Sequence, residues 1–385
     1  MLRANPYRVF FPLGVLCGWL GASHWFFYGF GFISTYSGLG HALIMTEAMF
    51  SAFAFGFLMT AIPRRTETAP ASWIEIILGA AGIAVTAVAA NRGEFVLAEY
   101  GFVGAMSVLL VFAVRRTESR SAGRRPPNAF VLIPIGAAAG IAGAVLITRM
   151  LNGQGSLEAY LIGRELVQQG VFLCFLLGVG ALILPLIQGI ETPPDRAASA
   201  SHRLARLGYA AAGVAIIASL IADPWWPRAM TALRGAIVIA ALFAGRAARW
   251  PKQPGLHRRV AVIAVALAPT GLLAAAAFPR HTVAALHIMY IGSLSLLALS
   301  IATHVTLGHG GRRDLLGGNP VRVIAIAVFV LAAMAMRVTA HLWPERYYEV
   351  IGVAALVWIA GSVAFAAILL GTGRSAGAVE LAPSR

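Results

Sequence analysis

The chain has 385 residues, of which 59% are hydrophobic and only 12% charged, and its formal net charge is +15. A soluble chain usually carries about a quarter charged residues, so the composition excludes an ordinary soluble domain. The excess positive charge lies in short loops between long apolar runs, where membrane insertion requires it, and therefore does not indicate binding to nucleic acid.

Apolar runs of about 20 residues, enough to cross the hydrocarbon core of a bilayer, recur along the whole chain. Turn sequences rich in Pro and Gly separate them, such as AIPRRT (61–66) and LGGNP (316–320). The pattern predicts an all-α polytopic integral membrane protein with about twelve transmembrane helices, at residues 10–32, 39–62, 73–91, 95–114, 129–148, 161–188, 207–223, 227–245, 260–278, 282–307, 320–339 and 347–371.

The polar segment 189–206 predicts a cytoplasmic linker between a first six-helix half (1–188) and a second one (207–371). Residues 372–385 are expected to form a flexible cytoplasmic tail. The halves show no self-similarity of the kind that inverted-repeat transporters carry. Most Lys and Arg residues fall on the side of the two termini, which places both termini in the cytoplasm.

Ionisable side chains inside the predicted spans are few, and each costs several kcal/mol unless it is paired, so they are candidates for function. On the outer side these are His24, His41, Glu165 and His287, and on the inner side His304 and His309. Glu47 lies deeper in the second predicted helix, and His281, Arg337 and His341 lie near the outer ends of helices. His202 and His257 belong to basic loops and are expected to be solvated. Both cysteines, Cys17 and Cys174, lie in apolar runs, and the chain has no CxxCH motif, which excludes a c-type haem.

His41 and His287 begin helices that run in the same direction, so they should lie at a similar depth. Imidazole is a common ligand of haem iron and copper, and the two could hold a metal or a haem. The alternative is a pair of interfacial histidines that face water among the lipid headgroups. Residues 287 to 304 span about 25 Å of helix, so His304 cannot bind the same metal as His287; it could bind another metal or contact a neighbouring helix.

His309 and Arg312 lie in LGHGGRRD (307–314), which also has the features of a helix end: glycines for the C-cap and cations near the negative end of the dipole. Glu165 could relay protons, or it could be a neutral structural residue. Gln168 and Gln169 share its face of the helix and could hydrogen-bond it, whereas the adjacent Arg164 points elsewhere.

Two long segments resemble the NnrS family. HALIMTEAMFSAFAFGFLMTAIP (41–63) is similar to its helix-2 signature, and ALHIMYIGSLSLLALSIATHVTLGHGGR (285–312) to its late span with a Leu-Gly-His-x-Gly-Arg end. NPYRVFFPLG (5–14) is similar to its opening pattern. The matching positions are His41, Gly56, Pro63, His287, Leu307, Gly308, His309, Gly311 and Arg312. The family's helix-2 pattern is His-Ala-His-Glu-Met, and here Leu43 and Ile44 replace its second His and its Glu.

The resemblance implies a bacterial inner-membrane protein that binds haem b and copper and takes part in denitrification or the response to nitric oxide and nitrosative stress. It implies His41, His287, His309 and Arg312 as cofactor-binding residues, with Arg312 pairing a haem propionate. His24 or His304 could replace a missing metal ligand.

The residues leave a second hypothesis open, a transporter without a prosthetic group. In that case His41, Glu165 and His287 would form a proton or substrate path. The sequence shows no electron route, so it does not decide whether the chain catalyses a reaction.

Overall fold

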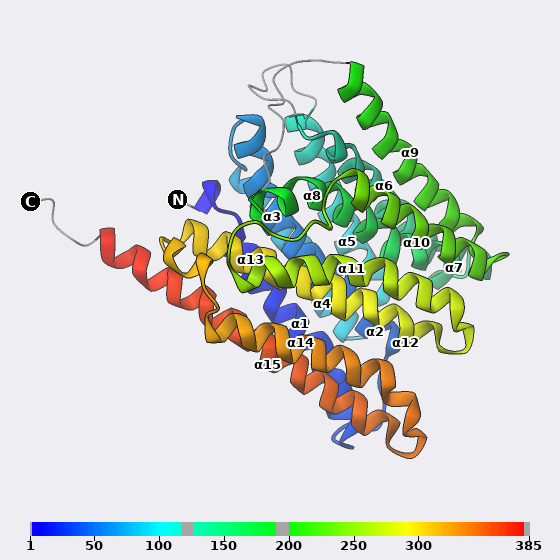
Figure 1. Ribbon diagram of the computed structural model, residues 1–385. Coiled ribbons are helices and arrows are strands. Elements are labelled where there is room, and N and C mark those ends of the chain that lie inside the picture. The colour runs from blue at the N-terminus through cyan, green and yellow to red at the C-terminus, as the bar shows by residue number, and fades with distance from the viewer. Residues whose placement is uncertain (1, 118–125, 190–199, 381–385) are drawn as a thin grey trace, which may run out of the picture.

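The computed structural model describes residues 2–117, 126–189 and 200–380, and all regular elements within these ranges are helical. Twelve helical segments are long and apolar enough to cross a membrane, which confirms the predicted number. The chain is therefore a polytopic helical membrane protein whose spans contact the lipid bilayer (Figure 1).

We number the spans 1 to 12 in chain order. They consist of α1 (Tyr7–Gly29); α2, η2 and α3 (Gly38–Ala42, Leu43–Phe50, Ser51–Thr66); α4 (Trp73–Asn91); α5 (Phe95–Thr117); η3 and α6 (Asn128–Val131, Leu132–Leu151); α7, η4 and α8 (Leu157–Glu165, Leu166–Gly170, Val171–Ile187); α9 (Ala200–Ala222); α10 (Pro227–Ala244); α11 (Leu256–Ala277); η5, α12, η6 and α13 (Pro279–His281, Thr282–His287, Ile288–Ser295, Leu296–His309); α14 and η8 (Val321–Thr339, Ala340–Leu342); and η9 and α15 (Pro344–Arg346, Tyr347–Glu380). Two short 3-10 helices, η1 (Leu2–Ala4) and η7 (Arg313–Gly317), lie outside the spans.

Several helices extend beyond their predicted bounds. Span 7 begins at Ala200, so the segment 200–206 of the predicted linker is helical, while 190–199 lies outside the described residues. The last helix continues to Glu380, where the predicted tail had begun at 372. Residues 381–385 of that tail also lie outside the described residues. In both places the helix continues into a polar sequence, where hydrophobicity no longer marks it.

Serine side chains cap the starts of three spans. Ser37 accepts a hydrogen bond from the backbone N–H of Gly40, and Ser156 accepts one from Ala159. Ser72 and Glu75 form a reciprocal capping box at the start of α4. Each cap satisfies backbone donors that the first turn of a helix leaves without a partner, so these serines fix where spans 2, 3 and 6 begin.

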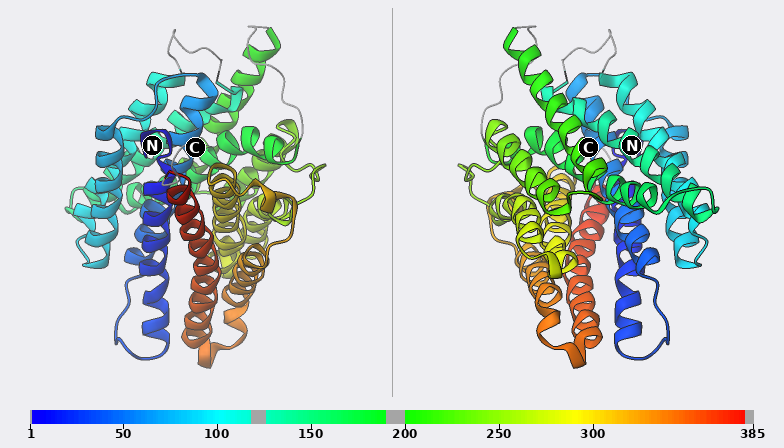
Figure 2. Two further views of the ribbon diagram at one scale, coloured as in Figure 1. Left: turned by 90° about the vertical axis from the view of Figure 1, so that its left-hand side faces the viewer. Right: turned by 90° about the vertical axis from the view of Figure 1, so that its right-hand side faces the viewer.

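The same pattern of helix neighbours occurs three times along the chain, in spans 1–4, 5–8 and 9–12. In each set the first span packs against the second, and the third packs against the fourth. Adjacent sets meet through spans 4 and 5 and through spans 8 and 9, and span 12 returns to pack along span 1. Figure 2 shows the resulting closed arrangement, with α15 beside α1. The twelve spans therefore form three groups of four.

The second span of each set contains a π-helical segment, which begins within the first half of the span: η2 in span 2, η4 in span 6 and η6 in span 10. π-Helical turns are rare, and they occur frequently at functional sites. Each segment begins directly after, or two residues after, one of the predicted site residues His41, Glu165 and His287. These three residues thus occupy corresponding positions in the three sets.

The twelve spans give the molecule two ends, which we name the His41 end and the His309 end. The start of α1 lies beside the end of α15 at the His309 end, where Tyr7, Arg8, Leu369 and Thr372 line one cavity. At the other end, the connections between spans 1 and 2 and between spans 11 and 12 project beyond the rest (Figure 2). The assignment of the His309 end to the cytoplasm stays a prediction from the distribution of arginines.

Spans 3 and 4 approach closely at two glycines. A Cβ added to Gly101 would lie 2.8 Å from the carbonyl oxygen of Gly82 and 2.9 Å from the backbone nitrogen of Thr86. Backbone atoms cannot move aside as a flexible side chain can. Small residues at such crossings allow helix backbones to pack directly in membranes.

We expect Gly101→Ala to lower the thermal unfolding temperature of the purified protein by several degrees, since overpacking a tight contact costs about 1–3 kcal/mol. Gly104→Ala is the matched control, because Gly104 lies on the same helix and a Cβ there meets nothing within 4 Å. Equal unfolding temperatures for the two variants would contradict the close contact.

Candidate functional site

His41 lies in the last turn of α2, two residues before the π segment of span 2 begins. Its Nδ1 is 2.9 Å from the carbonyl oxygen of Gly21 in α1. A carbonyl oxygen only accepts hydrogen bonds, so Nδ1 donates and Nε2 keeps its lone pair. The indole of Trp25 packs edge-on against the imidazole, with ring centroids 5.5 Å apart. The side chain is thus fixed by span 1 and presents Nε2 as a free ligand atom.

His287 has the same arrangement in span 10. It ends α12 directly before the π segment η6, and its Nδ1 donates to the carbonyl oxygen of Val283 at 2.7 Å. Its Nε2 is therefore also unprotonated. Histidines that bind metals usually donate their other ring N–H to a backbone carbonyl or a carboxylate, which fixes the tautomer. Both residues are half-buried.

Arg337 in span 11 brings a positive charge to this pair. It interacts electrostatically with both His41 and His287, and the two imidazoles interact with each other. Its side chain is 8% exposed, and Tyr347 contacts the guanidinium by a hydrogen bond. A buried guanidinium next to two histidines is suited to bind an anionic group such as a carboxylate.

His24 lies near His41 at the same end of the molecule, and the two interact electrostatically. Its Nε2 is 2.8 Å from the amide oxygen Oδ1 of Asn91 at the end of α4. The structure therefore gathers His24, His41 and His287 at one end, although they come from spans 1, 2 and 10. We call His41, His287 and Arg337 the His41–His287 site.

The donor set of the site fits a haem better than an isolated metal ion. Axial ligation of haem iron requires at most two imidazoles with free nitrogens, and a guanidinium suits a propionate. The described residues contain no group of three or more His, Cys, Asp or Glu side chains that could hold a metal ion. A copper ion would therefore need a ligand of another kind in addition to these histidines.

His309 and Arg312 are not brought together at the other end. Nδ1 of His309 donates to the carbonyl oxygen of Val305 at 2.9 Å, and its Nε2 contacts Nη1 of Arg64. Arg312 lies 3.5 Å from a carboxylate oxygen of Asp314. The helix ends at His309, and Gly311 adopts a φ of 75° just beyond it. The features of a helix end are thus present, while both nitrogens of His309 already have partners.

His304 pairs with His257, whose Nε2 lies 3.0 Å from Nδ1 of His304. The expectation that His257 is solvated in a basic loop was wrong. It is 1% exposed, because α11 begins at Leu256 and its first turn packs against span 10. His304 therefore belongs to a pair at the His309 end, remote from the His41–His287 site.

Glu165 ends α7 and accepts a hydrogen bond from Nε2 of Gln169, as the sequence predicts. Arg164 also pairs with it, at 3.2 Å, which corrects the expectation that this arginine points elsewhere. A long guanidinium side chain can reach back to the adjacent residue even though the two face different directions. Tyr290 of span 10 interacts electrostatically with Glu165.

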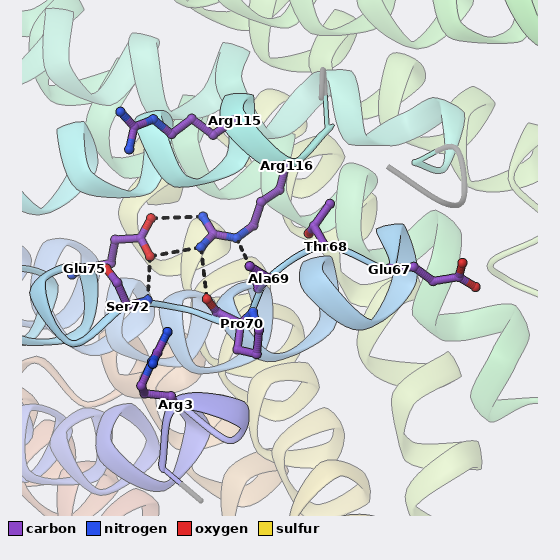
Figure 3. Close-up of a pocket in the computed structure, with 9 residues that line it drawn as sticks. All are labelled: Arg3, Glu67, Thr68, Ala69, Pro70, Ser72, Glu75, Arg115 and Arg116. Atoms are coloured by element: carbon purple, nitrogen blue, oxygen red, sulfur yellow. Dashed lines mark hydrogen bonds and ion pairs between the residues drawn. The ribbon is translucent and has the colours of Figure 1, made fainter. Parts of the chain in front are cut away.

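A separate cavity of about 590 Å³ lies at the His309 end between the starts of spans 1 and 3 and the end of span 4. Figure 3 shows its main interaction, in which Arg116 contacts both carboxylate oxygens of Glu75, at 2.9 and 3.0 Å. Arg116 also donates to the carbonyl oxygens of Ala69 and Pro70. These contacts hold the connection between spans 2 and 3 in place, which is a structural role.

Sequence reasoning missed four buried ionisable residues. Arg337 was assigned to the outer end without a role, and His257 was assigned to a loop. Glu99 in span 4 and Arg234 in span 8 were passed over, although each is an ionisable residue within an apolar run. That signal could have identified both, since a charge in a span is costly unless it is paired or neutralised.

Comparison with known proteins adds one finding to this geometry. A search of curated proteins finds no relative of this chain. The model of the family described as NnrS protein matches residues 1–372, which include all twelve spans and every residue of the His41–His287 site. The match extends over almost the whole chain, and the chain therefore belongs to the NnrS family.

Proposed function

We propose that this chain binds haem b at the His41–His287 site and acts in the response of a bacterial cell to nitric oxide and nitrosative stress. One observation carries the proposal. Two imidazoles from spans that are remote in sequence lie at the same end, and each donates Nδ1–H to a backbone carbonyl and leaves Nε2 free.

Each residue of the site has a part in this proposal. His41 and His287 would bind the iron through Nε2, and the carbonyl oxygens of Gly21 and Val283 keep the imidazoles in the ligating tautomer. Arg337 would pair with a propionate. When bound, haem iron would supply one-electron chemistry and a metal centre with affinity for nitric oxide. Trp25 limits the rotation of His41.

The proposal includes copper as a second metal. His24, which lies at the same end as the His41–His287 site, would be one of its ligands. His304, His309 and Arg312 remain candidates for a further site at the His309 end. Membership of the NnrS family and the resemblance of the two long motifs support the link to nitric oxide and denitrification. The distribution of arginines supports a bacterial cytoplasmic membrane with both termini inside.

A growth test addresses the role. We expect a strain that lacks this chain to recover more slowly from a nitric oxide donor than its parent, and a plasmid copy of the chain to restore recovery. A copy with His41→Ala should fail to restore it. His341→Ala is the control, because His341 also lies at the His41 end and donates Nδ1–H to a backbone carbonyl, that of Val338.

Equal restoration by both variants would contradict a role for the site. The transporter hypothesis predicts a different result, in which protein free of haem changes the internal pH of vesicles when a substrate is added. Such coupling, lost in a Glu165→Gln variant, would favour that hypothesis over haem binding.

A further inference from the structure

Two glutamates inside the membrane-spanning part have no counter-charge. Glu47 lies in the π segment of span 2 and Glu99 in span 4, and both are 0% exposed. Within the part of the chain that the structure describes, none of their four carboxylate oxygens has a hydrogen-bond partner. The two carboxyl groups interact electrostatically with each other. Neither takes part in the His41–His287 site.

The surroundings of the pair are apolar. A small core of Leu43, Ile44, Ala89, Ala90 and Ala98 lies where spans 2, 3 and 4 meet; Ala98 precedes Glu99 directly, and Leu43 and Ile44 lie about one turn before Glu47. The hydroxyl of Ser51, one turn after Glu47 on the same helix, is also buried without a partner. Ser51 lies on the same face of the helix as Glu47. Several buried polar groups therefore lie close together here without hydrogen-bond partners from the described part of the protein.

Charged groups on the packed helices do not neutralise the pair. Span 3 carries Glu75, which is paired with Arg116 at the opposite end of span 4. Arg64 and Arg65 of span 2 lie at the His309 end, and Arg149 of span 5 lies in the last turn of α6. Span 1 contributes Tyr7, Arg8, Cys17, His24 and Tyr28, and η4 of span 6 has no ionisable residue. Among the described residues, Glu99 is the group that interacts electrostatically with Glu47.

Two ionised carboxylates in such a place would repel each other and lack solvation, so the pair must be neutralised. A proton bound by the pair does this with the groups present, since a protonated carboxyl carries no charge. We propose that Glu47 and Glu99 form an intramembrane proton-binding site, in which the two carboxyl groups together hold at least one proton. Binding adds H⁺ to a carboxylate oxygen, forms one O–H bond, raises the charge of the pair by one and moves no electrons.

The π segment of span 2 supports this assignment. It changes the hydrogen-bond register of the helix around Glu47, and such segments are typical of functional positions. A purely structural pair of glutamates at 0% exposure would be expected to have hydrogen-bond partners, as nearly all buried polar groups do. The proposal does not depend on a bound haem.

Infrared spectroscopy of the full-length protein in detergent tests the site, because a protonated carboxyl has a C=O stretching band separate from that of a carboxylate. We expect this band at neutral pH in the wild type. Glu47→Gln and Glu99→Gln should each diminish it, and the double variant should remove that component. Two control variants should retain the band. Glu345→Gln changes an exposed residue in η9, and Glu165→Gln changes a glutamate that has Gln169 and Arg164 as partners.

Two results would overturn the proposal. One is a band at neutral pH that the double variant leaves unchanged. The other is a wild-type pair without the band, combined with a stoichiometric sodium, potassium or calcium ion in metal analysis, which would identify a cation site. The second measurement needs only the wild type, so the proposal stays testable if a variant does not fold.

Discussion

We expect replacement of His41 or His287 by alanine to abolish the Soret absorption of the purified protein. Either change removes one of the two imidazoles whose Nδ1 donates to a backbone carbonyl and whose Nε2 would bind the iron. Loss of an outer hydrogen-bond partner alone lowers metal affinity by about 10- to 100-fold, and loss of the ligand itself should cost at least as much. Haem per protein, measured as its pyridine complex, gives the result.

His341→Ala is the matched control for these variants and should retain the haem. It removes a histidine from the same end of the molecule, and the ring of His341 stacks on His281 with centroids 4.2 Å apart. Arg337→Leu should retain iron ligation with weaker haem binding. An unchanged spectrum in both His41→Ala and His287→Ala would refute the assignment of the site.

We expect Arg234→Leu to lower the free energy of unfolding more than replacement of any other charged residue in span 8. Arg234 is 1% exposed, and its Nη2 lies 2.7 Å from Oδ1 of Asp223 and 2.8 Å from the hydroxyl of Thr231. Breaking a buried ion pair by removing one partner costs about 3–5 kcal/mol, because the other charge stays buried. Thermal unfolding in detergent should show a drop of many degrees.

A double variant separates the charge from the packing. Asp223→Leu combined with Arg234→Leu removes both charges, and apolar replacement of a buried pair is often neutral, so most of the stability should return. Arg228→Leu, at an exposed position on the same helix, should have little effect. If the double variant were as unstable as the single one, the ion pair would not be the cause.

The spans could be predicted from the sequence because each span contains one long run of apolar residues, which face either the protein interior or the lipid. Span 2 was expected at 39–62 and extends from Gly38 to Thr66, and the apolar run bounds it well. Span 7 was expected to begin at 207 and begins at Ala200, because its first turns carry His202, Arg203 and Arg206. A helix that leaves the bilayer keeps its hydrogen bonds but loses the hydrophobic pattern.

The three-fold grouping and the π segments could not be predicted in this way. A comparison of two six-helix halves cannot detect a pattern that repeats every four spans. A π segment changes which backbone N–H and C=O groups form hydrogen bonds with each other. The hydrophobicity of the side chains does not indicate this change. The division of the chain into two six-helix halves, 1–188 and 207–371, remains a prediction.

The candidate site could be predicted in part. The equal depth of His41 and His287 follows from the direction of their helices, and the structure places the two within electrostatic range. The presence of Arg337 beside them depends on how span 11 packs, which no local pattern encodes. The pairing of His304 with His257 is another contact between remote segments, across spans 9 and 10.

The visible spectrum of the purified wild-type protein, recorded oxidised, reduced, and reduced with nitric oxide, tests the central proposal most directly. Metal analysis of the same sample should accompany it. We predict a Soret band that shifts when nitric oxide is added, with iron in proportion to protein. A colourless and metal-free protein from haem-replete cells would contradict haem binding and leave the transporter hypothesis as the better account of His41, Glu165 and His287.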